Sequence, residues 1–387
     1  MSNTWNIYLL AIVSFLVGTS DYIISGILDK IADAMGVTVV AAGQLITVFS
    51  FVYAIGTPIL MALTARADRR TLLVAALGVF VAGNLLSFFL PSFGLLMVAR
   101  IIMALGAGVV VVTALSLAAK MAPPGKQASS IATVVMGFTT SLIIGVPLGR
   151  VIAAAYGWEY VFVGIALAGL VALAVLFLTI PQMEGDAPVP LGKQFALLKK
   201  TKVALGLSIT FFWLGGYSIA YTYLSPYLLD VAGMSEQLLS TALLAFGIAS
   251  LVGSKAGGYS ADKWGVSFTL IVGMILHVVS LLLLSIAAPS TTAVFVLLIV
   301  WSFSAWSSGP TQQYNLVTLN PESSGVMLSL NQSMMQLSMS AGAAIGGIAV
   351  GNVSLSSITW FGALGVAIAI AASLKLSRLS LQKKVAG

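Results

Sequence analysis

The stretch from Val161 to Ile180 reads VFVGIALAGLVALAVLFLTI and contains no charged side chain. A helix needs about 20 apolar residues to cross the hydrocarbon of a bilayer, so this stretch is long enough to span a membrane. Lipid offers no hydrogen-bond partners, so the backbone polar groups of a span must be hydrogen-bonded within the protein, as in a helix or a closed β-barrel. This run is about twice the length of a barrel strand, which favours a helix. The stretch therefore predicts a transmembrane helix.

The composition of the whole chain agrees with this prediction. Of its 387 residues, 59% are hydrophobic and only 7% are charged, and the mean hydropathy is +1.07. A soluble domain carries about 25% charged residues, so the chain cannot be a water-soluble globule. Twelve spans of about 20 residues leave loops of about ten residues each, which predicts an all-α membrane protein with almost no domain outside the bilayer.

The residue counts exclude several functional classes. The chain has no cysteine, which excludes disulfides, thiolate metal sites and cysteine nucleophiles. One histidine, His277, and eleven acidic residues that mostly fall in loops leave little from which to build a metal site or a hydrolytic triad. We therefore expect that the protein is not an enzyme and that it binds neither a metal ion nor a cofactor. The net charge of +7 comes from basic residues scattered singly between apolar runs, so we expect no nucleic-acid partner.

The apolar runs form two sets of six, separated by a polar stretch at residues 181–202. We predict spans at 5–28, 40–63, 71–90, 94–117, 128–151, 158–180, 203–229, 236–259, 266–287, 292–315, 325–349 and 355–376. This divides the chain into an N-terminal bundle (1–180), a linker (181–202), a C-terminal bundle (203–376) and a tail (377–387). The basic half of the linker, with Phe195, Leu197 and Leu198 interleaved, fits either an amphipathic helix on the inner leaflet or a solvated connection.

The basic residues predict the orientation. With the N-terminus in the cytoplasm, Lys30 and Arg150 lie near the outer face, Arg100 lies within a span, and the remaining fifteen of the eighteen basic residues are cytoplasmic. The positive-inside rule therefore predicts that both termini are cytoplasmic. Residues 1–6 have no basic residue and precede a long apolar run, which predicts an uncleaved first helix. The fifteen are Arg66, Arg69, Arg70, Lys120, Lys126, Lys193, Lys199, Lys200, Lys202, Lys255, Lys263, Lys375, Arg378, Lys383 and Lys384.

A shift of the chain against itself by 197 residues indicates an internal duplication, as in many transporters. The shift carries Arg66 onto Lys263 and the span-5 glycines Gly145 and Gly149 onto glycines of span 11. It carries Asp21 onto a serine and Arg100 onto a leucine, so the two membrane charges belong to the N-terminal half alone. We predict two pseudo-symmetric six-helix bundles.

Four motifs resemble those of the major facilitator superfamily, over essentially the whole chain. The segment Gly258-Tyr-Ser-Ala-Asp262-Lys263-Trp264-Gly265 resembles the family's loop signature G-x-x-x-D-[RK]-x-G. Arg100 followed by Gly106 and Gly108 resembles the arginine motif of proton antiporters. The span-5 segment Gly145-Val-Pro147-Leu-Gly149 resembles the antiporter motif, and Asp21 followed by Gly26-Ile-Leu resembles the span-1 motif of twelve-span drug:proton antiporters.

A further segment narrows the resemblance. Trp301-Ser-Phe-Ser-Ala-Trp306, followed by Pro310, Gln312 and Gln313, is similar to the branch of bacterial purine, nucleoside and sugar exporters. The N-terminal copy of the loop signature departs from the family pattern, because it has Ala65 in place of the acid and Asp68 in place of a glycine.

Asp21 is the most informative single residue. A carboxylate at the centre of a span is disfavoured by about 2.5 to 3.5 kcal/mol, so it is a functional candidate by default. Asp21 and Arg100 each lie about seven residues from the outer end of their spans, or about 10 Å at 1.5 Å per residue. The matched depths predict a pair, which serves either to couple protons to transport or only to pin two helices together.

The C-terminal half supplies a predicted substrate wall. Aromatic and amide side chains recur at helical spacing in spans 7, 10 and 11 and suit planar, hydrogen-bonding ligands. Aromatic stripes also occur as simple packing. We expect His277 to be a hydrogen-bonded structural residue, because the family places its span at the periphery. The wall consists of Trp213, Tyr217, Tyr221, Trp306, Gln313, Asn331, Met335 and Gln336.

The resemblance implies a function. It implies a monomeric antiporter in the bacterial cytoplasmic membrane that exports small organic molecules, such as drugs or purines, as protons flow in through Asp21 and Arg100. Conformational change would involve Gly145, Pro147, Gly149 and Arg66 in the first half, and Gly258, Asp262, Lys263 and Gly265 in the second. A proton-coupled importer would share this chemistry and is the alternative.

Overall fold

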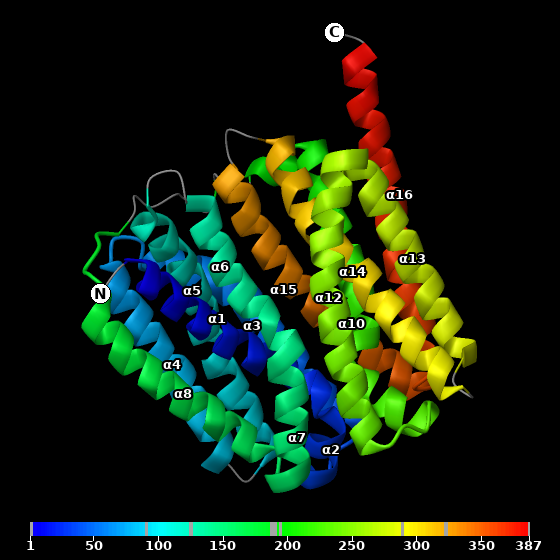
Figure 1. Ribbon diagram of the computed structural model, residues 1–387, viewed down its shortest axis with the longest axis horizontal. Coiled ribbons are helices and arrows are strands. Elements are labelled where there is room, and N and C mark those ends of the chain that lie inside the picture. The colour runs from blue at the N-terminus through cyan, green and yellow to red at the C-terminus, as the bar shows by residue number, and fades with distance from the viewer. Residues whose placement is uncertain are drawn as a thin grey trace. The chain divides into compact units, whose positions relative to one another are not determined.

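Figure 1 shows the computed structural model, which describes residues 3–89, 92–123, 127–185, 192, 196–287, 290–320 and 324–385. Within these ranges the chain is helical and contains twelve helices long and apolar enough to cross a membrane, as predicted. The linker positions Lys193 and Phe195 and the loop residue Lys126 lie outside the described residues.

The spans of the first half are α1 (Asn3–Gly26), α3 (Val39–Leu63), α4 (Arg69–Phe89), α5 (Phe93–Met121), the pair α6 (Gln127–Thr140) and α7 (Val146–Tyr156), and α8 (Glu159–Thr179). A π-helical turn, Ser141–Gly145, joins α6 to α7. The spans of the second half are α10 (Thr201–Thr222), α12 (Glu236–Trp264), α13 (Val266–Ala287), α14 (Thr291–Leu319), α15 (Ser324–Asn352) and α16 (Ser357–Val385).

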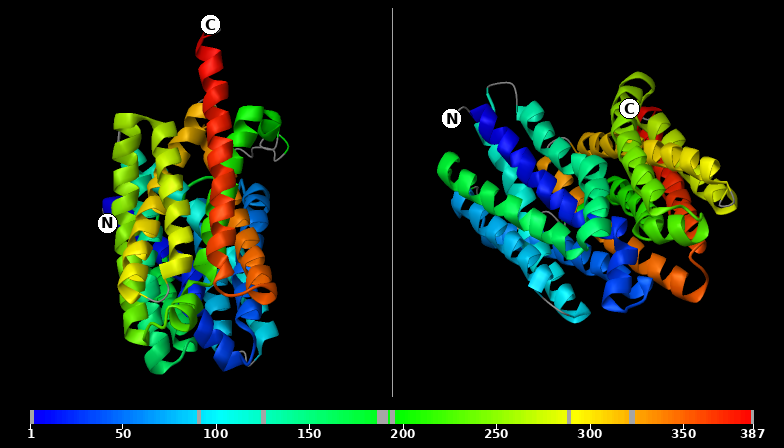
Figure 2. Two further views of the ribbon diagram at one scale, coloured as in Figure 1. Left: turned by 90° about the vertical axis from the view of Figure 1, so that its right-hand side faces the viewer. Right: turned by 60° about the horizontal axis from the view of Figure 1, so that its bottom comes forward.

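Short elements lie between the spans. They are α2 (Leu28–Met35), a 3-10 turn at Leu197–Lys199, α11 (Leu224–Pro226) and a π-helical turn at Tyr227–Val231. The seventh span thus ends at Thr222, earlier than the predicted residue 229, and the fifth runs on to Tyr156. Helix α16 continues well past the predicted end of its span and projects beyond the other helices of its unit (red in Figure 2).

The chain forms two compact units. The first comprises Met1–Thr38 and Val48–Val189, and the second comprises Val39–Thr47 and Pro190–Gly387. In the first unit, α1 packs against α6, α5 and α8, and α4 packs against α5 and α8. In the second, α10 packs against α15 and α16, while α14 packs against α12 and α13.

Close backbone approach builds the core of the first unit. A Cβ atom at Gly106 of α5 would lie 2.6 Å from the backbone nitrogen of Phe80 in α4, so only glycine allows these helices to pack so closely. Small residues at such contacts are typical of membrane helix pairs. The contact places Asn84 of α4 and Arg100 of α5 in one core, where both are completely buried.

The loop between α3 and α4 is tied to the segment that follows α8. Asp68 accepts hydrogen bonds from the backbone N–H and hydroxyl of Thr71 and from the backbone N–H of Met183, each at 2.8 Å. The backbone N–H of Arg69 donates to the Met183 carbonyl at 2.8 Å, and Lys120 donates to the carbonyl of Glu184 at 3.0 Å. Asp68, at the position where the family pattern has glycine, thus fixes the end of the first unit.

These hydrogen bonds change the ionisation of Asp68. Partial burial raises the pKa of its carboxyl, but hydrogen bonds from Thr71 and Met183 and the charge of Arg70 outweigh that effect and hold the pKa below its ordinary value. Because the folded pKa is depressed, the stabilisation is complete above the unfolded pKa of about 3.9. It is lost as the pH falls through the folded value.

We expect Asp68→Asn to lower the heat-denaturation midpoint of the purified protein at pH 7, because the amide replaces a charged acceptor facing three donors. The difference from wild type should shrink as the pH is lowered below about 4, where the wild-type carboxylate is itself protonated. Glu184→Gln, at an exposed acid in the same region, is the matched control and should change the midpoint little. A difference that stays constant down to pH 3 would contradict this assignment.

Candidate functional site

Asp21 and Arg100 lie buried in the first unit. Asp21 of α1 is 2% exposed, Arg100 of α5 is completely buried, and their charges interact. Nη1 of Arg100 donates to the backbone carbonyl of Ser20 at 2.8 Å, and its guanidinium carbon lies 4.0 Å from the ring centre of Phe49 in α3. The arginine is therefore held by a backbone acceptor and an aromatic face in addition to the carboxylate next to Ser20.

Polar side chains surround this pair. The hydroxyl of Ser20 lies 3.4 Å from Oδ1 of Asn84 and 3.5 Å from the sulfur of Met103, and Nδ2 of Asn84 donates to the carbonyl of Phe80. Nε and Nη2 of Arg100 have no hydrogen-bond partner among the described residues. A buried charge with unsatisfied donors is costly and is sensitive to any change in its counter-charge.

The glycine-proline segment of span 5 packs directly on α1. Ideal Cβ atoms at Gly145 and Gly149 would overlap Thr19 and Ile23 of α1, and Pro147 is buried. The π-helical turn Ser141–Gly145 immediately precedes the proline. Proline clashes with the carbonyl four residues back in a regular helix, and the wider turn relieves that clash.

Arg150 forms a contact that the sequence analysis missed. Its side chain is completely buried, its Nη1 donates to the carbonyl of Gly26 at 3.1 Å, and it forms an ion pair with Asp29. These contacts fasten α7 to the point where α1 gives way to α2. The sequence does contain a hint of this ion pair. Arg150 directly follows the glycine motif, and Asp29 directly follows span 1, so both lie near the predicted outer face of the membrane.

An aromatic cluster occupies the interior of the second unit, with Tyr217 of α10 at its centre. Tyr217 stacks on Tyr221 with ring centres 5.0 Å apart, and the rings of Trp301 and Trp306 lie 5.7 and 6.0 Å away. Trp213 is also buried and lies near Trp306, as a Cβ at Gly309 would contact both rings. The structure thus brings together the four aromatic residues predicted for the substrate wall.

His277, Trp301 and Phe246 belong to the same cluster and were not predicted to do so. The imidazole ring of His277 lies 6.3 Å from Tyr217 and 6.0 Å from Trp301, and Phe246 lies 5.1 Å from Trp301. The expectation of a hydrogen-bonded histidine is wrong within the described residues, where neither ring nitrogen has a hydrogen-bond partner. His277 packs as an aromatic ring. Trp301 was not predicted to belong to the substrate wall because it lies on a different face of α14 from Trp306.

An amide network lies along α10, α14 and α15. Nε2 of Gln312 donates to the hydroxyl of Thr210 at 3.0 Å and to the carbonyl of Gly206 at 2.6 Å, and the hydroxyl of Thr210 donates to Oδ1 of Asn331 at 2.8 Å. Nδ2 of Asn331 lies 3.6 Å from the sulfur of Met335. The network contains Gln312, whereas helical spacing predicted its neighbour Gln313.

The remaining predicted positions are three residues of the substrate wall and the residues predicted to take part in conformational change. Gln336 of α15 is buried, whereas Gln313 and Met335 are half-buried. Arg66 is exposed in the loop after α3. At the end of α12, the ammonium group of Lys263 lies 5.3 Å from the ring of Trp264, and Gly265 ends the helix with a φ of +89°, a conformation that favours glycine. Gly258 and Asp262 lie on the last turns of the same helix.

Comparison with known proteins identifies the family. The model of the Major Facilitator Superfamily matches residues 10–343. The chain is 69% identical over 374 residues to the uncharacterised MFS-type transporter YbcL of Bacillus subtilis (strain 168), covering 97% of this chain and 96% of that protein. It is 29% identical to a second MFS-type transporter of that organism, YtbD, over 95% of this chain and 94% of that protein.

Solved structures share the fold. A D-xylose-proton symporter matches 97% of both chains with a TM-score of 0.77 at 16% identity. A bacterial homologue of the human lysosomal transporter Spinster matches 98% of both chains with a TM-score of 0.76 at 17% identity. The family is one of transporters rather than enzymes, in agreement with the residue counts. The chain therefore belongs to the Major Facilitator Superfamily.

Proposed function

We propose that this transporter is a proton-coupled antiporter that exports small organic molecules from the cytoplasm by alternating access. The observation that carries the proposal is the burial of Asp21 beside Arg100 among membrane-spanning helices. A carboxylate in such a place is expensive and therefore a functional candidate. Of the two ionisable partners, the carboxylate is the one that can exchange a proton, because arginine stays protonated in proteins.

The contacts of Arg100 suggest how the pair works. The guanidinium is anchored by the Ser20 carbonyl and the Phe49 ring, so it keeps two of its contacts when Asp21 is neutral. Protonation of Asp21 from outside removes the counter-charge. When the site opens to the cytoplasm, the proton leaves, the ion pair forms again and substrate binds. Inward proton flow then drives substrate outward.

The second unit supports a planar, hydrogen-bonding substrate. Its aromatic cluster offers ring faces, and the network around Asn331 and Gln312 offers amide groups. Resemblance to exporters of purines, nucleosides and sugars points to the same class, and the antiporter motifs support export. A proton-coupled importer is the alternative, since a D-xylose-proton symporter shares this fold and the same carboxylate would serve inward transport. The direction of flux under an imposed pH gradient separates the two.

The setting of the proposed activity follows from the sequence. The distribution of basic residues supports cytoplasmic termini, and the Bacillus relatives support a bacterial cytoplasmic membrane. Each chain contains both the charge pair and the aromatic cluster, which supports a monomer as the working unit. Protons are the proposed coupling ion, without any bound cofactor.

We expect Asp21→Asn to abolish uphill transport driven by a pH gradient in proteoliposomes while downhill exchange of substrate persists, because the amide keeps the shape of the side chain but does not titrate. Asp33→Asn, at an exposed acid of α2, is the matched control and should transport like wild type. Arg100→Lys keeps the charge but loses the planar fork and should also uncouple transport. Undiminished uphill transport by Asp21→Asn would overturn the proposal.

The division of labour between the units gives another prediction. Asn331→Ala should change the relative transport rates across a panel of purines, nucleosides, sugars and dyes, since a ligand group left without its partner loses about 1 to 3 kcal/mol. The number of protons per substrate should not change, because an amide does not titrate. Asn352→Ala, at an exposed position of the same helix, is the control. An unchanged substrate profile with an altered proton ratio would place Asn331 in the coupling path instead.

A further inference from the structure

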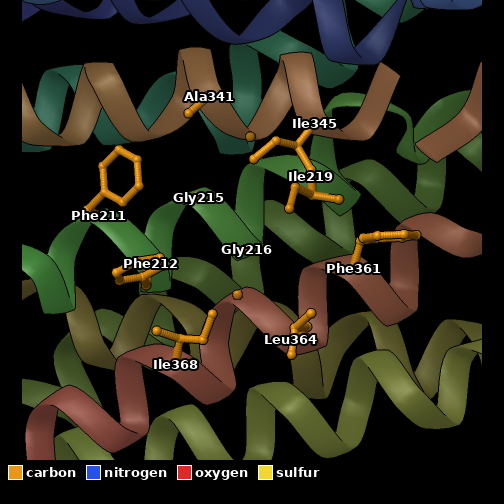
Figure 3. Close-up of a pocket in the computed structure, with 12 residues that line it drawn as sticks. Phe211, Phe212, Gly215, Gly216, Ile219, Ala341, Ile345, Phe361, Leu364 and Ile368 are labelled. Carbon is orange, nitrogen blue, oxygen red and sulfur yellow. The ribbon is translucent and has the colours of Figure 1, made fainter. Parts of the chain in front are cut away.

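An apolar crevice lies between α10, α15 and α16 of the second unit (Figure 3). Its cavity volume is about 160 Å³, below the roughly 300 to 1,000 Å³ typical of pockets that hold a whole drug-sized ligand, so it suits a narrow apolar group. Every side chain that lines it is apolar, and its residues take no part in the charge pair, the aromatic cluster or the amide network.

Four glycines form the wall of the crevice where its three helices meet. Gly215 and Gly216 of α10, Gly342 of α15 and Gly365 of α16 line the crevice. A Cβ at Gly342 would lie 2.5 Å from the carbonyl oxygen of Gly215, and a Cβ at Gly365 would lie 2.9 Å from the Cα of Gly216. The three helices thus meet backbone to backbone at these glycines, which form part of the crevice wall.

The crevice opens toward the outer surface of the unit. Ile345, Leu364 and Ile368 border it and are 44%, 58% and 41% exposed. All three belong to helices long and apolar enough to cross a membrane, so the hydrocarbon of the bilayer is the medium that best matches them. Water would find no polar partner against these walls.

The shape of the crevice follows the helices. Its residues run from Phe211 to Ile219 on α10 and from Phe361 to Ile368 on α16. At 1.5 Å per residue these stretches extend about 10 to 12 Å along the helix axes. A hollow elongated in this direction matches a hydrocarbon chain, which also runs across the leaflet. Filling it restores dispersion contacts that bare walls lack.

We propose that this crevice is a binding site for one acyl chain of a membrane phospholipid. The acyl chain lies against Gly215 and Gly216 of α10, the helix that also carries Tyr217. The lipid headgroup remains at the bilayer surface. Binding is apolar and does not depend on the identity of the transported substrate or on Asp21. The proposal therefore stands apart from the proposed antiport.

The test uses the intact protein in liposomes that contain a phosphatidylcholine with a diazirine midway along one chain. After illumination, peptide mass spectrometry should find crosslinks concentrated on residues 341–345 and 361–368. Ala341→Phe, whose side chain points into the crevice in Figure 3, should reduce this labelling about tenfold, equivalent to about 1.4 kcal/mol. Ile348→Phe, at a 64% exposed position of the same helix outside the crevice, should leave it unchanged.

Competition in the wild-type protein provides an independent measurement should Ala341→Phe fail to fold. Unlabelled phosphatidylcholine should suppress the crosslinks in proportion to its excess. Labelling spread evenly over all exposed apolar positions would overturn the proposal, as would labelling unaffected by a folded Ala341→Phe. Suppression by planar aromatic compounds at constant lipid composition would also overturn it, since the crevice would then hold a small molecule.

Discussion

The cost of holding a charge inside a bilayer-spanning bundle governs the arrangement of the first unit. Arg100 is completely buried, and the attraction between opposite charges is many times stronger in a low-dielectric interior than in water. The surrounding helices offset this cost with a hydrogen bond to the Ser20 carbonyl, a contact with the Phe49 ring and the opposite charge of Asp21. Close packing of α4 on α5 at Gly106 and of α7 on α1 at Gly145 holds these groups in place.

The two units share a six-helix plan but differ in the side chains that are buried inside them. The first concentrates buried charge, in the Asp21–Arg100 pair and in the ion pair of Arg150 with Asp29. The second replaces charge with rings around Tyr217 and with an amide network through Thr210. This asymmetry fits the proposed coupled transport, in which the driving ion requires a titrating group and the substrate requires a neutral surface.

The sequence predicted the fold well and the side-chain contacts less well. Length and hydropathy determine transmembrane spans almost alone, so all twelve were found, and errors concern ends such as Thr222 and Tyr156. Helical periodicity correctly grouped Tyr217, Tyr221 and Trp306 on adjoining faces. It could not find His277 and Phe246, because membership of the cluster depends on how α13 and α12 pack against α10.

Neighbouring residues of one helix posed a second difficulty. Gln312 and Gln313 differ by 100° around α14, and only the packing shows that Gln312 reaches Thr210. The role of Asp68 likewise depends on a distant partner, since it accepts a hydrogen bond from Met183, 115 residues along the chain. Periodicity assigns a residue to a face, but the partner of that face comes from tertiary structure.

Proton coupling as proposed requires that Asp21 gain and lose a proton while Arg100 remains charged beside it. Infrared difference spectroscopy of the reconstituted protein, comparing acidic with neutral pH, tests it most directly because protonated carboxyl groups have a distinct carbonyl stretch. We expect a carboxyl band in the wild type that is absent from Asp21→Asn and shifted in Arg100→Lys. An identical band in all three proteins would show that the proton binds elsewhere and would contradict the account.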